Sequence, residues 1–367
     1  MNLPITDATI FAETDFRGKK VPFGIKRADR RMHFYVLGKT GVGKSMVFRN
    51  MVISDILAGE GVGIIDPHGD LVEDLLNFIP SNRINDVVYF DPSDTDLPIG
   101  FNLLELDDPD QRDLVADGVV EVFKKHFEYS WGPRLEYLLH NTILTILEVQ
   151  GQTLLAVQRL LIDKNFRKFI VKQVNDPVLV KFWEEEYASM ATNSRLITEA
   201  VAPIQNKVGR FLSSATIRNI VGQVKSTIDL KEVMNEGKIL LINLSQGRLG
   251  EESSALLGGM IVTRLQATAM ERVSVPEEER KDFFLFVDLE RHPVEQDAPP
   301  EALLEILHAD HALAAFANAA PNQGVTGLMV CCSAPLSGRS ASLKFLSIFL
   351  TPLAPRILGP FPITTAQ

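Results

Sequence analysis

The sequence predicts an α/β protein in which a parallel sheet is interrupted by a long helical segment. Three observations carry this prediction. Early in the chain, short apolar runs alternate with helical patterns, which is the arrangement that builds a parallel sheet. From about residue 107 to 225, helical patterns dominate. Apolar strand-like runs then return at 238–244 and 283–287, so the sheet is expected to resume after the helical segment.

The sheet is expected to begin after a short β-rich lead-in, residues 1–30. A compact apolar run at 33–37 fits a buried strand, and a glycine-rich loop follows it. Apolar residues at helical spacing predict a helix over 44–58, which Gly59 and Gly61 end. The end of the lead-in is expected to carry a basic patch made of Lys26, Arg27, Arg30 and Arg31.

Two more strands are predicted at 62–65 and 87–90, with helical spacing from Leu71 to Leu76 between them. The helical segment is expected to be an all-α insertion, and its clearest helices are predicted at 135–147 and 159–174. Basic residues of this segment fit a solvated helix face better than a DNA groove.

The end of the chain differs in amino-acid composition from the rest. A helix is expected from Ser253 to about Met270, before the strand at 283–287. After Asp288 charged residues are sparse and prolines and alanines are frequent, so no structure is assigned to the tail. The predicted organisation is a lead-in (1–30), a core in two pieces (31–106 and 226–290), an all-α insertion (107–225) and an atypical C-terminal tail (291–367).

Composition limits the classes of protein to which the chain can belong. The net charge of −10 argues against coating by nucleic acid, although a local basic loop or pore can still bind DNA. The two cysteines, Cys331 and Cys332, are adjacent and fit neither a disulfide framework nor a zinc site, so a reducing, cytoplasmic location is expected. No apolar run approaches the length that spans a bilayer, so no intrinsic membrane span is expected.

The loop from Gly38 to Ser45 matches the whole phosphate-binding pattern G-x-x-x-x-G-K-S/T. Glycines let backbone N–H groups close around phosphates, and the helix starting at Lys44 directs its positive end at the same anion. In this pattern Lys44 bridges the β- and γ-phosphates, and the Ser45 hydroxyl ligates magnesium. The alternative is a glycine turn that merely precedes a helix. The residues expected to bind ATP and Mg²⁺ are Gly38, Lys39, Thr40, Gly41, Val42, Gly43, Lys44, Ser45 and Met46.

A phosphate-binding loop also needs an acidic residue that holds the magnesium through water. Asp288 directly follows the predicted strand 283–287, where that residue belongs, and the helical insertion explains its sequence distance from Lys44. The expected metal-binding residues are therefore Ser45 and Asp288. The alternative is an aspartate that simply ends a strand.

Two other loops follow predicted strands and should lie at the same edge of the sheet. Asp66-Pro-His-Gly-Asp70 is either part of a ligand-binding edge or a turn in which Asp70 caps the next helix. Arg248 follows the strand 238–244 and is either an arginine finger, acting on a phosphate of its own or a neighbouring subunit, or a solvated loop residue. Arg134 is a weaker candidate of the same kind.

Four segments together resemble one family. They are 34–45, the Asp66–Asp70 motif, Phe90-Asp-Pro92 leading on to Ile99-Gly-Phe-Asn102, and Leu241-Ile-Asn-Leu-Ser245. These segments are similar to those of the HerA and TraG/TraD class of DNA-pumping ATPases, which includes conjugative coupling proteins and type IV secretion ATPases. The resemblance covers about residues 26–290, and its specific part is the loop combined with Asp-Pro-His-Gly-Asp and a helical insertion.

The resemblance implies a RecA-like core in hexameric rings, with ATP between subunits and DNA moved through a central pore by pore loops. Together with the phosphate-binding loop and the loops that follow the strands, this resemblance implies a catalytic set. Its expected members are Lys44, Asp288, Glu290 and Arg248. Expected partners are a relaxase, a nuclease or secretion-channel proteins. Coupling proteins of this class usually carry N-terminal transmembrane helices, and this sequence looks more like the soluble branch. It is expected in the cytoplasm, or peripherally at the inner membrane through partners.

The sequence departs from this family directly after Asp288. The family has Asp-Glu there, whereas this chain has Leu289 and then Glu290, and one step along a strand turns a side chain to the other face. A later strand ending in a glutamine that senses the γ-phosphate has no clear counterpart. We hypothesise that the reading frame or the natural sequence changes near Asp288, which translation of the encoding DNA in all frames tests.

The departure leaves two alternatives to a DNA motor. One is an ATP-binding, poorly hydrolysing, truncated or frame-altered subunit that acts as an assembly module. The other is a P-loop enzyme that acts on proteins or small molecules, which an active enzyme without DNA stimulation would favour.

Overall fold

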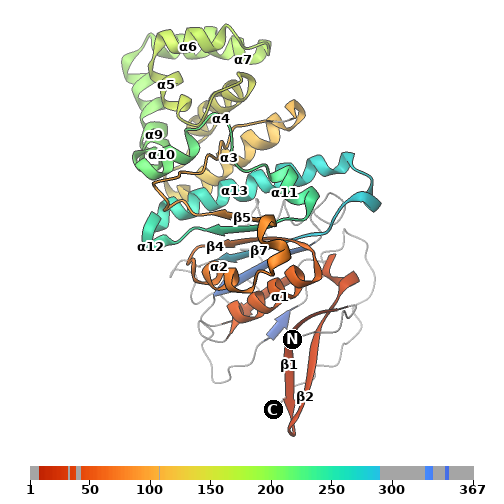
Figure 1. The fold of residues 1–367 in the computed structure, drawn as a ribbon. Coiled ribbons are helices and arrows are strands. Elements are labelled where there is room, and N and C mark those ends of the chain that lie inside the picture. Colours follow the sequence, from red (N-terminus) through yellow and green to blue (C-terminus); the bar gives the residue numbers. More distant parts are fainter. Residues whose placement is uncertain are drawn as a thin grey trace, which may run out of the picture.

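The computed structural model describes residues 8–31, 34–38, 43–106, 108–289, 327–333 and 344–346. These residues form an α/β fold, with a central sheet, a helical part beyond one face and a two-stranded hairpin projecting on the other side (Figure 1). The sheet has the order β5-β6-β4-β7-β8-β3-β9, and every pairing is parallel except that of β3 with β9. Its strands are β3 (Phe34–Gly38), β4 (Gly61–Asp66), β5 (Val87–Phe90), β6 (Ile239–Asn243), β7 (Phe283–Leu289), β8 (Gly327–Ser333) and β9 (Lys344–Leu346).

Helices cover both faces of this sheet, as strands buried on both faces require. The α1 side carries α1 (Lys44–Ala58) and α2 (Asp70–Leu75), and the α13 side carries α11 (Leu230–Glu236) and α13 (Glu251–Glu271). Side chains of β7 alternate between two cores, because Phe286 belongs to the α1-side core and Val287 to the α13-side core. The Phe48 ring of α1 packs edge-on against Phe286, with ring centroids 5.5 Å apart.

The described chain between β5 and β6 forms only helices and turns, stacked beyond α13 in Figure 1. Its α-helices are α3 (Arg112–His126), α4 (Pro133–Glu148), α5 (Ala156–Ile162), α6 (Lys164–Val171), α7 (Pro177–Lys181), α8 (Ala188–Ala191), α9 (Ser194–Ser213), α10 (Ala215–Val221) and α11, with a π-helix, η6 (Phe182–Tyr187), between α7 and α8. Shorter helical turns are η1 (Arg27–Arg31), η2 (Leu76–Phe78), η3 (Ser81–Asp86), η4 (Pro109–Gln111), η5 (Glu128–Ser130), α12 (Gln246–Leu249), η7 (Arg272–Ser274) and η8 (Glu277–Glu279). None of the helices in the described part of the chain has both the length and the apolarity needed to cross a bilayer.

The single helix predicted over 159–174 is wrong. The chain breaks between α5 and α6 at Asp163, whose carboxylate accepts hydrogen bonds from the backbone N–H groups of Asn165 (2.9 Å) and Phe166 (3.0 Å). The hydrogen bond from Phe166 is the largest cause that holds the pKa of Asp163 below its ordinary value, and the bond from Asn165 adds to it. An aspartate that caps a new helix therefore overrides apolar spacing that runs on through it.

Two strands lie in the tail, to which the sequence analysis assigned no structure. β8 lies between β7 and β3, and β9 pairs with the other edge of β3. The apolar run 327–332 becomes a strand because it pairs with neighbours on both sides, and such tertiary pairing is not encoded in local propensity.

The lead-in forms an antiparallel hairpin of β1 (Ala8–Phe16) and β2 (Lys19–Lys26). Its base packs on α1, where the Asn50 side-chain amide donates to the Phe11 carbonyl at 2.9 Å. The basic patch expected at its end needs correction, because Arg30 is only 1% exposed. Residue Arg30 is therefore part of the core and no part of a surface patch.

Arg30 and Asp55 form a buried ion pair that ties the hairpin, α1 and β7 together. The guanidinium donates to both Asp55 carboxylate oxygens, at 2.9 and 2.7 Å, and to the Thr9 hydroxyl at 2.7 Å. It also lies 4.2 Å from the centre of the Phe284 ring. Burial raises the pKa of the Asp55 carboxyl, and the Arg30 charge opposes that shift.

Replacing Asp55 with alanine is expected to lower the free energy of unfolding by about 3–5 kcal/mol, because it leaves the buried Arg30 charge without a counter-ion. Denaturant unfolding followed by circular dichroism measures the change. The matched control is Glu199→Ala, which removes the acid of an exposed ion pair with Arg195 and should change stability by less than about 1 kcal/mol. An Asp55→Ala variant as stable as this control would contradict the expectation.

Candidate functional site

Polar residues form a row across the carboxyl edge of the sheet. Asp288 of β7 is in register with Cys331 of β8, which is in register with Val36 of β3. On the other side of β7, Asp66 of β4 pairs with Asn243 of β6. The three polar residues of β4, β6 and β7 each lie two positions after a member of the α1-side core, so all three face the α1 side.

The α1 helix begins at this edge, directly after β3. Gly43 precedes it with φ of 94°, a left-handed conformation that favours glycine. Lys44 is only 7% exposed, whereas Ser45 and Met46 are exposed. Gly38 is the last residue of β3. The other expected loop residues, Lys39, Thr40, Gly41 and Val42, lie outside the described residues.

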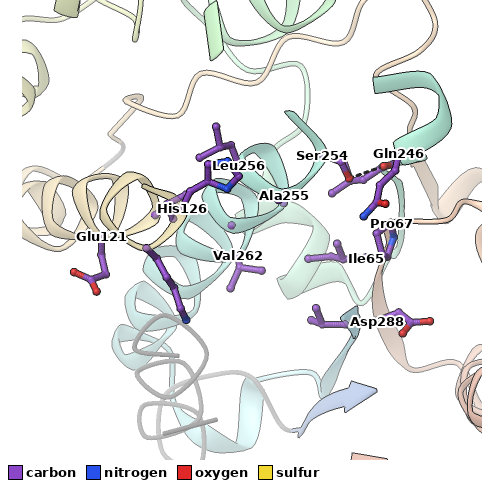
Figure 2. Close-up of a pocket in the computed structure, with 16 residues that line it drawn as sticks. Ile65, Pro67, Glu121, His126, Gln246, Ser254, Ala255, Leu256, Val262 and Asp288 are labelled. Carbon is purple, nitrogen blue, oxygen red and sulfur yellow. Dashed lines mark hydrogen bonds between the residues drawn. The ribbon is translucent and has the colours of Figure 1, made fainter. Parts of the chain in front are cut away.

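Asp288 lies on the same edge and the same side of the sheet as the start of α1. Only β8 separates β7 from β3, so the two strand axes are about 10 Å apart. A magnesium ion with oxygen ligands at about 2.1 Å and a bridging water fits between side chains across such a gap. The Asp288 side chain is partly buried, and Figure 2 shows its carboxylate pointing away from the helices beside it. Glu290 lies outside the described residues.

A cavity of about 340 Å³ lies on the opposite side of the same edge (Figure 2). Its walls come from α3, α13 and the ends of β4, β6 and β7, and include Ile65, Val262 and Val287. Asp288 also lines this largely apolar cavity, although its carboxylate faces the α1 side, so Asp288 lies between the cavity and the side of the edge where Lys44 lies.

The Asp66–Asp70 motif forms a tightly bonded turn. One Asp66 oxygen accepts from the backbone N–H groups of Leu71 (2.9 Å) and Val72 (3.2 Å), and the other accepts from that of His68 (2.9 Å). The residue that caps α2 is therefore Asp66, and not Asp70 as the sequence suggested, since Asp70 is the first residue of the helix. Asp66 is 1% exposed, and its three bonds favour a structural role.

This turn is also joined to the loop after β6. The backbone N–H of Leu244 donates to the Asp66 carbonyl at 2.8 Å, and that of Gln246 donates to the Pro67 carbonyl at 3.0 Å. Gly69 has φ of 89°, and a Cβ atom there would lie 2.5 Å from the Asn243 side-chain oxygen. The turn therefore fixes the start of α12, on which Arg248 lies.

Arg248 contacts acidic groups at the far end of the edge. Its guanidinium lies 3.4 Å from Asp91, 3.1 Å from the Ser93 hydroxyl and 3.5 Å from Glu73, and its side chain is about half exposed (52%). The strand order separates β6 from β3 by four steps, or about 19 Å. That distance exceeds the length of an arginine side chain, so Arg248 does not reach the start of α1 in its own chain.

Sequence reasoning named only part of this row. Asn243 and Asp91 were quoted as parts of family segments and given no role, yet each directly ends or follows a strand of the edge, as Asp66 and Asp288 do. The signal that finds them is the repeated placement of Asp or Asn at the carboxyl end of a buried strand. Their contacts, with Ser93 for Asp91 and with Tyr89 and Ser245 for Asn243, come only from the structure.

The fold and this edge can now be compared with known proteins. A sequence model of the helicase HerA central domain matches residues 15–265, well over half of the chain. The chain belongs to the HerA central-domain family. The HerA and TraG/TraD resemblance expected from the sequence is thus confirmed, and so is the predicted fold class with its RecA-like core. A search of the curated proteins finds no match.

Solved structures similar to this HerA-family chain include the bacterial conjugative coupling protein TrwB. Its unbound monoclinic form gives a TM-score of 0.53 at 18% identity, covering 85% of this chain and 64% of that one. The complex of TrwB with the GTP analogue GDPNP gives 0.54 at 17%, covering 84% and 66%, and that with ADP and Mg²⁺ gives 0.52 at 17%, also covering 84% and 66%. At this identity the likeness shows the fold, and the chain spans about two thirds of the length of these structures.

Proposed function

We propose that the chain is the motor subunit of an ATP-dependent DNA translocase of the conjugation or type IV secretion class. The observation that carries this proposal is the placement of Lys44 and Asp288 on one side of one sheet edge, with a single strand between β7 and β3. Membership of the HerA family and the nucleotide complexes of TrwB support it.

In the proposed site, the segment Gly38–Met46 holds the phosphates of ATP. Backbone N–H groups of the loop and the start of α1 bind the anion, and Lys44 adds a positive charge at the β- and γ-phosphates. Ser45 and Asp288 would hold Mg²⁺, which when bound would supply positive charge at the phosphates. Glu290 is the carboxylate proposed to polarise the attacking water.

The proposed unit is a hexamer in which each site is completed by the next subunit. β6, after which Arg248 lies, is four strands, or about 19 Å, from β3 of the same chain, so the proposed role of Arg248 is at a neighbouring site, where an arginine finger stabilises the transition state. Pore loops would move DNA mainly through phosphate contacts. Proposed partners are a relaxase, a nuclease or secretion-channel proteins, in the cytoplasm or at the inner membrane.

A second candidate function is ATP binding without efficient turnover, in an assembly module. The observation that favours it is Leu289, which stands directly after Asp288 where the family pattern has an acidic residue.

One experiment separates the two candidates. ATPase activity of the full chain is measured alone, with single-stranded DNA and with double-stranded DNA, beside native mass measurement with ATP. DNA-stimulated turnover by an oligomer supports the motor. ATP binding with no turnover under any of these conditions contradicts the motor and supports the assembly module.

For the assembly module, in which Glu290 does not activate water, replacing Leu289 with glutamate is expected to raise ATP turnover by about 100-fold, because a general base adds a factor of this order. ATP affinity should not change. The matched control is Leu289→Gln, which has a similar shape and no charge. If Glu290 already serves as the base, Leu289→Glu will have little effect and Glu290→Gln will instead reduce turnover, which would contradict this prediction.

A further inference from the structure

Among the described residues, side chains of the hairpin's outer half contact one another and Phe11 at its base. The Arg17 guanidinium lies 5.2 Å from the Phe16 ring centre, and the Phe23 ring packs edge-on against Phe11 at 5.4 Å. Residues Glu13–Phe16 and Lys19–Phe23 are exposed, and the ribbon projects from the body in Figure 1. Four strand residues extend about 13 Å. A two-stranded ribbon is marginally stable by itself in water, so an ordered projecting ribbon calls for a contact.

One face of this ribbon is apolar. Register places Thr14 opposite Val21 and Phe16 opposite Lys19, so these residues share a face with Phe23. The exposed fractions of Phe16, Val21 and Phe23 are 70%, 55% and 39%. Single exposed apolar residues are ordinary, whereas three aligned on one face of a projecting element indicate a docking surface.

The tip of the ribbon is basic and conformationally unfavourable. Arg17 and Gly18 form the two-residue turn, with φ of 53° and 74°. This turn is suited to Asn-Gly, and arginine in a left-handed conformation costs free energy. Arg17 therefore presents positive charge at a position where the backbone would favour another residue, and Lys19 and Lys20 of β2 add to this charge.

We propose that this ribbon docks on the loop 91–97 of a second copy of the chain, an inference that rests on the subunit-interface site proposed above. The loop is complementary in both charge and polarity. Asp94 and Asp96 are exposed, and Leu97 is 78% exposed. The Asp94 carboxylate accepts from the backbone N–H groups of Asp96 and Leu97, at 3.0 and 3.1 Å, so the loop has a fixed shape.

The position of Arg248 brings the two surfaces together. Arg248 contacts Asp91 and Ser93 at the base of this loop. If Arg248 lies at the start of α1 of the next subunit, the loop 91–97 lies beside that subunit as well. The ribbon packs on that same α1 helix, about two and three turns after its start, where Asn50 donates to the Phe11 carbonyl and Asp55 accepts from the Thr9 hydroxyl at 3.4 Å. The contact is head-to-tail, the type that closes rings.

A protein partner fits the ribbon better than nucleic acid does. Glu13 and Asp15 lie on its second face, where Glu13 pairs with Lys20 at 3.0 Å. These two carboxylates of β1 would repel phosphates. A chain of net charge −10 gains little DNA affinity from one tip that carries both signs of charge.

The test is assembly of the full-length chain, measured by native mass across a concentration series with ATP. Arg17→Glu with Lys19→Glu is expected to weaken assembly about tenfold, and so is Asp94→Lys with Asp96→Lys. Combining all four changes should restore assembly, because the charges are then exchanged. The control is Lys164→Glu with Lys168→Glu, exposed on α6, which should leave assembly unchanged.

Arg17→Asn separates docking from folding. It should melt at the same temperature as the original chain or higher, because Asn-Gly suits the turn, while its assembly weakens. Unchanged assembly in both charge reversals, or no recovery in the combined variant, overturns the proposal. Loss of DNA affinity with assembly intact also overturns it and identifies nucleic acid as the partner.

The readout is independent of turnover. Arg248→Ala should still assemble, so an assembled chain without ATPase activity would contradict only the proposed function. A chain that stays monomeric with ATP at every concentration would overturn the docking proposal.

Discussion

Replacing Lys44 with alanine is expected to abolish ATP binding and to lower turnover by about a thousandfold or more, while the fold remains intact. Lys44 is the first residue of α1 and is only 7% exposed at the edge that carries Asp288. Its charge offsets the β- and γ-phosphates at a site where water is largely excluded, so its loss removes a dominant interaction. A positive charge at a helix start is opposed by the helix dipole, so alanine is expected to leave the fold intact.

Thermal unfolding with and without ATP and Mg²⁺ measures this effect. A ligand at 100 times its dissociation constant stabilises a protein by about 2.7 kcal/mol, so the unaltered chain should gain several degrees and Lys44→Ala none. The matched control is Lys39→Ala. Lys39 stands at a variable position of the same loop pattern, where only backbone groups bind phosphate. Equal ATP stabilisation in Lys44→Ala and the unaltered chain would contradict the assignment of the site.

The parts of the fold that could be predicted from the sequence are those set by local periodicity. The strand before Gly38, the helix from Lys44 and the buried strand before Asp288 each carry a complete pattern within a few residues. Their order also predicts a parallel sheet, and the placement of Asp288 at a strand end follows from it. The α/β fold class is accordingly confirmed.

The features that could not be predicted depend on contacts between distant segments. Nothing near Arg30 in the sequence indicates that Asp55 and the Phe284 ring will surround it. The cap of α2 by Asp66 depends on the bend of one particular turn. The insertion of β8 between β7 and β3 depends on pairing across the sheet, and it sets the spacing of Lys44 and Asp288.

The roles of the individual site residues stay predictions. The structure changes the expected role of Arg248 more than that of any other site residue named from the sequence. The sequence left open whether this residue serves its own nucleotide or that of a neighbour. Four strand steps from β6 to β3 disfavour its own nucleotide, so the proposed arginine finger acts on that of a neighbour, and the alternative is still a solvated loop residue. Replacing Arg248 with alanine is therefore expected to lower turnover by about a thousandfold with ATP binding unchanged, which is the effect of losing an arginine finger.

Stability should change little in Arg248→Ala, because the Arg248 side chain is about half exposed (52%) and such ion pairs are worth less than about 1 kcal/mol. The control is Arg195→Ala, an exposed arginine on α9 that pairs with Glu199. It should keep full turnover.

Mixing two inactive variants tests the action between subunits directly. In a ring assembled from equal amounts of Arg248→Ala and Lys44→Ala chains, about one interface in four joins an intact Lys44 to an intact Arg248 from its neighbour. Turnover should therefore rise well above the sum of the two separate variants. If Arg248 acted within its own chain, no mixture would recover activity, because every chain would still lack one of the two residues. Recovery on mixing thus requires a site shared between two subunits. It also requires that the end of β6 of one subunit faces the start of α1 of the next.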